Sequence, residues 1–171
     1  EKELGTMEIL LVSPLNPIQI ILGKVIPYLI LSFINAMIIL SLGVFVFQVP
    51  IQGSLGLLIA ECVLFTLMSL SLGILISTVS DNQQSAMLLS MVGLMLPTVL
   101  LSGFVFPIEN MPILLQWLSV ISPARWFIVI VKNIMHKGTG IEYIWKETLI
   151  LLVMTLFFII QSYRKFKIRL E

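Results

Sequence analysis

The chain has 171 residues, of which 58% are hydrophobic and 11% charged, with a formal net charge of +1. A soluble domain carries about 25% charged residues, so this composition excludes an ordinary water-soluble fold and indicates an integral membrane protein. The balanced charge excludes electrostatic attraction of nucleic acid, and the single cysteine, Cys62, excludes an internal disulfide and a cysteine metal cluster.

The first fourteen residues, EKELGTMEILLVSP, are charged where most of the chain is apolar. The charged residues among them are Glu1, Lys2, Glu3 and Glu8. Residues 1–12 have helical spacing, and Pro14 ends the helix because proline disfavours helix at the residue before it. This pattern predicts either a docking element for a partner outside the membrane or a solvated terminus. The chain starts with Glu and has no signal peptide, so we expect the later part of a longer protein.

Four apolar stretches reach the length of a transmembrane helix, which is roughly 17 to 25 residues. They are residues 25–47, 55–79, 84–105 and 147–163. Asn16 and Pro17 suit the cap and first position of the helix that contains the first stretch. We expect a kink at Pro27 and bends at Gly93 and Pro97. The sequence therefore predicts an all-α membrane protein with four transmembrane helices.

The second apolar stretch contains small residues four positions apart, at Ser69, Gly73 and Ser77. This spacing puts them on one face of a helix, and small side chains allow transmembrane helices to approach closely. We expect a helix-packing face here, although Ser and Gly are common enough in such helices for the spacing to arise by chance.

Glu61 is an acid well inside the same apolar stretch. A charged carboxylate in lipid costs several kcal/mol unless it is paired or faces water. The favoured interpretation is that Glu61 reaches headgroups or a water-filled vestibule near the outer end of its helix. The alternative is a residue that lines the substrate pathway, paired with Arg125 or Lys132.

The stretch after the third apolar segment breaks repeatedly, over residues 107–134. Proline interrupts it at Pro123, and neither half reaches the roughly 20 residues that a span needs. The residues that mark the first break are Gly103, Phe106, Pro107, Met111 and Pro112. We predict two short helices that enter the membrane from outside and return, or lie in its interface.

The basic residues that follow the last apolar stretch predict the orientation of the chain. Arg164, Lys165, Lys167 and Arg169 place the carboxyl end in the cytoplasm by the positive-inside rule. Four crossings then place the amino-terminal segment and the turn at residues 80–84 on the cytoplasmic side, and residues 106–146 outside. That outer region nevertheless contains four basic residues, whereas the positive-inside rule expects Lys and Arg mainly on the cytoplasmic side.

Catalytic and cofactor motifs are absent from the sequence. It has no G-x-x-x-x-G-K-S/T phosphate loop, no H-E-x-x-H and no G-x-S-x-G, and its single histidine, His136, cannot build a multi-histidine metal site. We therefore expect neither an enzyme nor a bound cofactor or metal.

Four stretches resemble the membrane subunits of type-two ATP-binding-cassette (ABC-2) exporters. The first matches a family pattern, E-x-G-T-x-E-x-L-L-V-S/T-P, at Glu3, Gly5, Thr6, Glu8, Leu10, Leu11, Val12, Ser13 and Pro14. The others are the Gly23-Lys24 pair, LGILISTVSDNQQSAM at residues 72–87 and LSGFVFPIENMP at residues 101–112. Together they cover the whole chain in order.

The resemblance implies a six-span subunit of which residues 1–171 supply the last four spans. It implies that residues 1–14 form a coupling segment that docks on a separate cytoplasmic ATPase, with coupling residues Glu1, Glu3, Gly5, Thr6, Met7 and Glu8. It also implies a second permease subunit, identical or different, and alternating access in the cell membrane. It assigns no role to Glu61.

Two functions remain open from the sequence. One is the permease subunit of an ATP-driven exporter, and the other is a membrane scaffold that docks a cytoplasmic complex without transporting anything. The substrate cannot be read from the residues.

Overall fold

The computed structural model describes residues 17–168. The predicted coupling segment, residues 1–14, lies outside the described residues. The described part is helical and contains no strand. The all-α prediction is confirmed, and four helices are long and apolar enough to cross a membrane.

The first two long helices, α2 and α3, contain most of the first two predicted spans. Helix α2 runs over Pro17–Phe45 and continues through Pro27. Helix α3 runs over Leu55–Val79 and begins where the backbone N–H of Leu57 donates to the Ser54 hydroxyl, 3.4 Å away. This cap satisfies one of the amides that a helix start leaves unpaired.

The third span is a composite helix of three segments. It consists of α4 (Gln83–Ser90), a π-helical segment (Met91–Met95) and α5 (Leu96–Leu101). Asn82 and Ser85 form a capping box at its start. The N–H of Leu96 bonds to the carbonyl of Met91, which widens the helix just before Pro97. The break in regular α-helix therefore falls where Gly93 and Pro97 predicted a disturbance.

Two predicted bounds need correction. The third span ends at Leu101 and not at residue 105, and Gly103 follows with a left-handed φ of 78°. The last helix, α8, covers Ile141–Ile168 and so begins six residues before the predicted span of residues 147–163. The charged residues before 147 do not prevent the helix, because an acid such as Glu142 in the first turn favours it.

A broken helix pair separates the third span from the last. After a 3-10 turn at Ile108–Asn110, α6 covers Ile113–Ser119 and α7 covers Pro123–Lys137. The two helices are bent by 83° relative to each other. The predicted pair is confirmed, although α7 extends past residue 134 to Lys137, where Gly138 in the left-handed region ends it.

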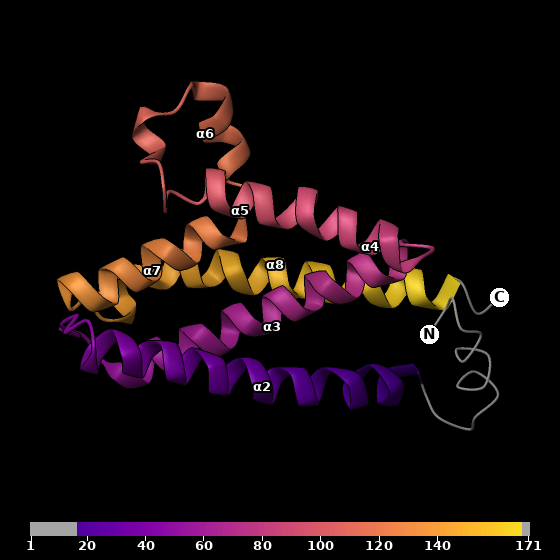
Figure 1. Cartoon of the computed structure of the whole chain (residues 1–171), viewed down its shortest axis with the longest axis horizontal. Coiled ribbons are helices and arrows are strands. Elements are labelled where there is room, and N and C mark those ends of the chain that lie inside the picture. The colour runs from indigo at the N-terminus through magenta and orange to yellow at the C-terminus, as the bar shows by residue number, and fades with distance from the viewer. Residues whose placement is uncertain (1–16, 169–171) are drawn as a thin grey trace.

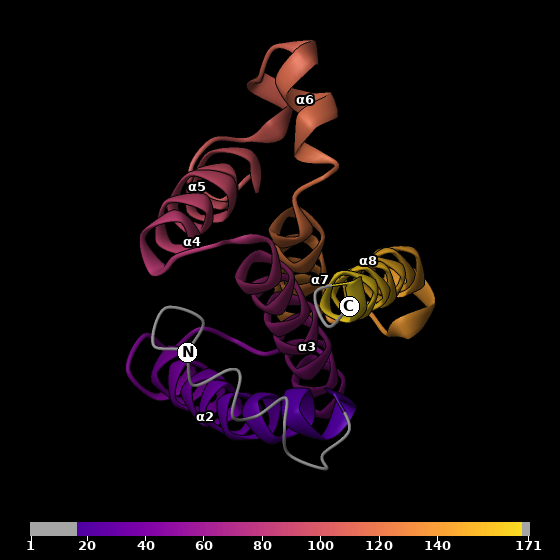
Figure 2. The ribbon, with the colours of Figure 1, turned by 90° about the vertical axis from the view of Figure 1, so that its right-hand side faces the viewer.

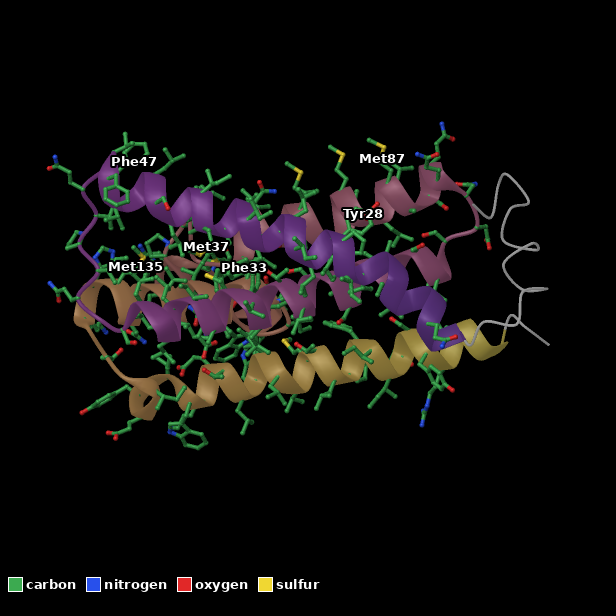
Figure 3. The ribbon with its side chains drawn as sticks, turned by 90° about the horizontal axis from the view of Figure 1, so that it is seen from below. Tyr28, Phe33, Met37, Phe47, Met87 and Met135 are labelled. Carbon is green, nitrogen blue, oxygen red and sulfur yellow. The ribbon has the colours of Figure 1, made fainter. Side chains whose placement is uncertain are left out.

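The long helices lie side by side as a bundle with α3 near its centre (Figures 1 and 2). The α3–α4 turn, the start of α2 and the end of α8 lie at one end of the bundle, and the α2–α3 and α7–α8 connections lie at the other (Figure 1). Figure 3 shows Phe47 and Met135 together at that second end. Helix α7 runs along the bundle beside α3 and α8, whereas α6 stands apart. This arrangement agrees with the predicted even number of crossings.

The buried core lies where α3, α7 and α8 meet. Its members are Leu58, Ile130, Ile134, Ile144 and Leu151. Most other apolar side chains of α2, α4, α5 and α8 are exposed, as expected of a surface that faces lipid.

The α2–α3 connection holds the end of α7 in place. The backbone N–H of Gln52 donates to the carbonyl of Met135, 3.1 Å away, which is one of the carbonyls that a helix end leaves unpaired. Gly53 lies so close to Ile134 that a Cβ at Gly53 would come within 2.6 Å of the Ile134 carbonyl oxygen. Only glycine fits this contact without a shift of the backbone.

Candidate functional site

Glu61 is the central polar residue of the α3–α8 contact. Its side chain is 3% exposed, and its Oε1 accepts a hydrogen bond of 2.7 Å from the hydroxyl of Thr148 on α8. Its Oε2 is buried and has no hydrogen-bond partner within residues 17–168. The carboxyl group is thus enclosed in protein with half of its hydrogen-bonding capacity unused.

This burial corrects the favoured interpretation of Glu61, which had the side chain reaching headgroups or water. The alternative pairing is also not observed, because Glu61 bonds to Thr148 and Arg125 bonds to α6. The physical reason is packing. Helix α8 covers this face of α3, so the carboxyl group lies against the Thr148 hydroxyl.

Two further contacts hold α3 against its neighbours on the carboxyl-terminal side of Glu61. The rings of Phe65 on α3 and Phe127 on α7 stack with centroids 4.1 Å apart and planes within 9°. Further along, the Ser162 hydroxyl of α8 donates to the Ser71 carbonyl of α3 over 3.4 Å. Small polar residues therefore allow the two spans to approach closely.

The predicted small-residue face lies elsewhere on α3. Ser69, Gly73 and Ser77 are exposed in this chain, and a Cβ at Gly73 would meet nothing within 4 Å. The residues of α3 that are buried are Leu58, Glu61, Met68, Ser71 and Thr78. At about 100° per residue the two sets lie on nearly opposite sides of the helix. The helix-packing role of the Ser69–Gly73–Ser77 face stays a prediction.

Arg125 joins the two helices of the broken pair. Its Nη1 donates to the Gln116 carbonyl over 3.2 Å and to the Ser119 hydroxyl, both on α6, and its guanidinium lies 5.2 Å from the centre of the Trp126 ring. The Trp126 indole N–H donates to the Val120 carbonyl over 3.0 Å. The corner between α6 and α7 is therefore held by side chains of the first turn of α7.

The residues predicted to mark the first break lie around the 3-10 turn. A Cβ at Gly103 would lie 3.0 Å from the Ile108 side chain, so both the positive φ and the space favour glycine. Phe106 is exposed, and Pro107 and Pro112 precede the 3-10 turn and α6. The carbonyl of Met111 accepts from the Gln116 side chain over 2.9 Å. The α-helix is thus interrupted between Leu101 and Ile113, as predicted. The contacts of these five residues do not indicate a ligand site.

Sequence reasoning did not find Thr148, Gln116 or Ser119 as partners of the charged residues. Thr148 lies in an apolar stretch where a hydroxyl often bonds its own helix, and it also donates to the Ile144 carbonyl over 3.0 Å. The only clue in the sequence was Glu61 itself, because a buried acid needs a hydrogen-bond donor from a facing helix. The sequence did not show which helix would face it. Within the described residues, no three potential metal ligands of the His, Cys, Asp or Glu type lie together.

Residues 1–164 match the family described as ABC-2 family transporter protein. The chain belongs to this family. It is 42% identical over 155 residues to the probable multidrug ABC transporter permease YbhR of Escherichia coli K12, and 34% identical over 171 residues to YbhS of the same organism, described in the same words. It is also 30% identical over 161 residues to ABC transporter G family member 20 of Dictyostelium discoideum.

These ABC-2 alignments cover most of the chain but under half of each relative. The alignment with YbhR covers 91% of this chain and 42% of YbhR. The alignment with YbhS covers 100% of this chain and 45% of YbhS, and that with the Dictyostelium protein covers 93% of this chain and 22% of the relative. No solved structure matches the chain. The family match covers residues 1–164, a range that includes the predicted coupling segment and the four predicted spans.

Proposed function

We propose that the chain is a large part of the membrane-spanning region of a permease subunit of an ATP-driven exporter. The observation that carries the proposal is the continuous family match over residues 1–164, shared with relatives that are named permeases. In this proposal two permease subunits, identical or different, enclose the translocation pathway in the cell membrane. Both ends of this chain face the cytoplasm.

The proposed coupling element is the segment of residues 1–14, which contacts a separate ATPase subunit. Its acidic residues Glu3 and Glu8 lie in the part that resembles the family pattern. The four spans behind it include α2, which follows the segment directly, and the tightly packed α3–α8 pair. Movement of the segment would thus act on the bundle through α2.

Charge reversal in the coupling segment tests this proposal. The full-length permease is reconstituted with its ATPase in proteoliposomes, and ATP hydrolysis is compared with that of the ATPase alone. We expect Glu3→Lys and Glu8→Lys to bring hydrolysis down to the level of the free ATPase and to weaken copurification, because each substitution reverses a charge of the segment at the proposed contact.

Glu109→Lys is the matched control, since it makes the same charge change at an exposed residue of the 3-10 turn, predicted on the outer side. It should leave both hydrolysis and copurification unchanged. Undiminished stimulation in the Glu3 and Glu8 variants, with normal membrane insertion, would contradict the coupling role.

A further inference from the structure

The Thr148 hydroxyl has two oxygen neighbours that both need a hydrogen. Its Oγ1 lies 2.7 Å from Oε1 of Glu61 and 3.0 Å from the carbonyl oxygen of Ile144, one turn back on α8. A hydroxyl donates one hydrogen and accepts through two lone pairs, so either oxygen of the 2.7 Å contact can carry the hydrogen of that bond. Thr148 cannot donate a full hydrogen bond to both neighbours, and one contact lacks a hydrogen unless Glu61 supplies it.

The second oxygen of Glu61 has no donor at all. Oε2 is buried and has no hydrogen-bond partner within residues 17–168, and the whole side chain is 3% exposed. A buried carboxylate persists in a membrane only where charges, donors or water offset the loss of hydration. An ionised Glu61 would have one shared hydrogen at Oε1 and none at Oε2, so its surroundings do not stabilise the charge.

The elements packed around Glu61 bring no cation to it. The core residues that α2 and α7 contribute are apolar, namely Leu40, Phe127, Ile130, Val131 and Ile134. On α3 the neighbouring ionisable residue is Cys62, which is half-buried. On α8 Lys146 is exposed and lies over the Trp145 ring, 5.8 Å from its centre, and Glu147 is an acid whose own Oε2 is buried without a partner in the described chain.

A neutral carboxyl group satisfies every short contact at this position. The hydroxyl form of Oε1 donates to Thr148 Oγ1, and the Thr148 hydrogen then goes to the Ile144 carbonyl, which is a common bond for threonine in a helix. Oε2 becomes an uncharged carbonyl oxygen, and burying it unpaired costs far less than burying a charge. The hydrogen count therefore favours the protonated acid.

We propose that Glu61 is a proton-binding site in the α3–α8 contact, with its carboxyl group neutral while the two spans are packed together. The site lies about 9 Å along α3 from Leu55, at 1.5 Å per residue, toward the end of the bundle that carries the α2–α3 connection (Figure 1). If α3 and α8 part, water reaches the carboxyl group and accepts the proton. The site goes beyond the proposed function, and neither the direction of transport nor ATP coupling is needed for it.

An ionised Glu61 that shares the Thr148 hydrogen with the Ile144 carbonyl is the competing explanation. Infrared spectroscopy separates the two, because a protonated carboxylic acid has a C=O stretching band apart from the bands of carboxylates and amides. The full-length permease with its ATPase is measured at neutral pH in dodecyl maltoside, a detergent without carbonyl groups. We expect the wild type to show an acid band that Glu61→Gln removes.

Two further variants assign the band to Glu61. Glu109→Gln removes an exposed acid of the 3-10 turn and should leave the band in place. In a Glu147→Gln background, Glu61→Gln should still remove it, so the band does not belong to the neighbouring buried acid. An absent acid band in the wild type, or a band that persists in Glu61→Gln, would overturn the site.

The pH dependence of stability is the second measurement. The folded protein holds a proton that the unfolded chain releases into water at neutral pH, so this contribution to stability is present at low pH and falls as pH rises. Glutamine stays uncharged and can donate to Thr148 Oγ1. We therefore expect the thermal unfolding temperature of the wild type to fall more steeply with rising pH than that of Glu61→Gln. Equal slopes, or a Glu61→Gln protein that does not fold, would contradict a neutral Glu61.

Discussion

At the scale of single residues, the contact between Glu61 and Thr148 shows how an acid is accommodated inside an apolar bundle. The carboxyl group is enclosed by α8 and receives one hydrogen bond, while its second oxygen has no partner in the described chain. A buried polar group without a partner costs more than a formed hydrogen bond contributes. Thr148 is thus the residue on which the burial of Glu61 depends.

Removing that hydroxyl should destabilise the protein. We expect Thr148→Val to lower the free energy of unfolding by about 1–3 kcal/mol, because both oxygens of Glu61 would then be buried without a partner. Thermal unfolding in detergent measures the loss. Thr155→Val is the control, since the buried hydroxyl of Thr155 bonds only to the Leu151 carbonyl of its own helix. Equal losses in the two variants would contradict the role of Thr148.

At the scale of elements, α3 has two faces of different character. One face carries Glu61 and Ser71 and packs on α8, and the opposite face carries Ser69, Gly73 and Ser77 and is exposed in this chain. Both faces contain small residues, so small size alone does not reveal which face meets a neighbour in the same chain. The contacts of α8 decide it.

A leucine should lower stability on the face that packs on α8 and leave it unchanged on the exposed face. We expect Ser71→Leu to cost about 1–3 kcal/mol of unfolding free energy, because the larger side chain would overpack the α3–α8 contact. Gly73→Leu should leave the stability of the single chain unchanged, since nothing lies within 4 Å of the added Cβ. Thermal unfolding of the two variants in the same detergent compares them, and a loss at Gly73 as large as that at Ser71 would contradict the assignment of faces.

At the scale of the whole molecule, the arrangement of the bundle supports one orientation for both ends. The α3–α4 turn and the end of α8 lie together, opposite the α7–α8 connection (Figure 1). The broken pair α6–α7 is bent by 83°, and the end of α7 contacts the α2–α3 connection, at the end of the bundle away from the α3–α4 turn (Figure 1). That the pair returns the chain to the side from which it entered stays a prediction.

Cysteine labelling tests the predicted orientation. In a Cys62→Ala background, single cysteines at Gln84, Gly140 and Lys165 sample both ends of the bundle, and all three positions are exposed. We expect a membrane-impermeant maleimide to label Gly140→Cys on intact cells, and Gln84→Cys and Lys165→Cys only after permeabilisation, because the basic tail follows the positive-inside rule. The reverse pattern would invert the topology, and opposite labelling of Gln84 and Lys165 would exclude the bundle arrangement.

Much of the molecule is determined by local chemistry that the sequence displays directly. Runs of apolar residues long enough to cross the hydrocarbon core determined the four spans, and prolines and glycines determined the break between the third and the last. The family pattern in residues 1–14 led to the ABC-2 family, which the match over residues 1–164 confirms. These features depend on neighbours in the chain, so no tertiary information was needed.

The partners of the charged residues were decided only by the tertiary structure. From the sequence, Glu61 could reach headgroups or a water-filled vestibule, or pair with Arg125 or Lys132. In the structure α8 brings Thr148 to the acid, and the bend at Pro123 brings α6 to Arg125. The packing face of α3 was likewise decided by where α8 lies. In a chain whose helices are apolar on all sides, the pattern along one helix does not specify which side meets its neighbour, and only the contact between helices does.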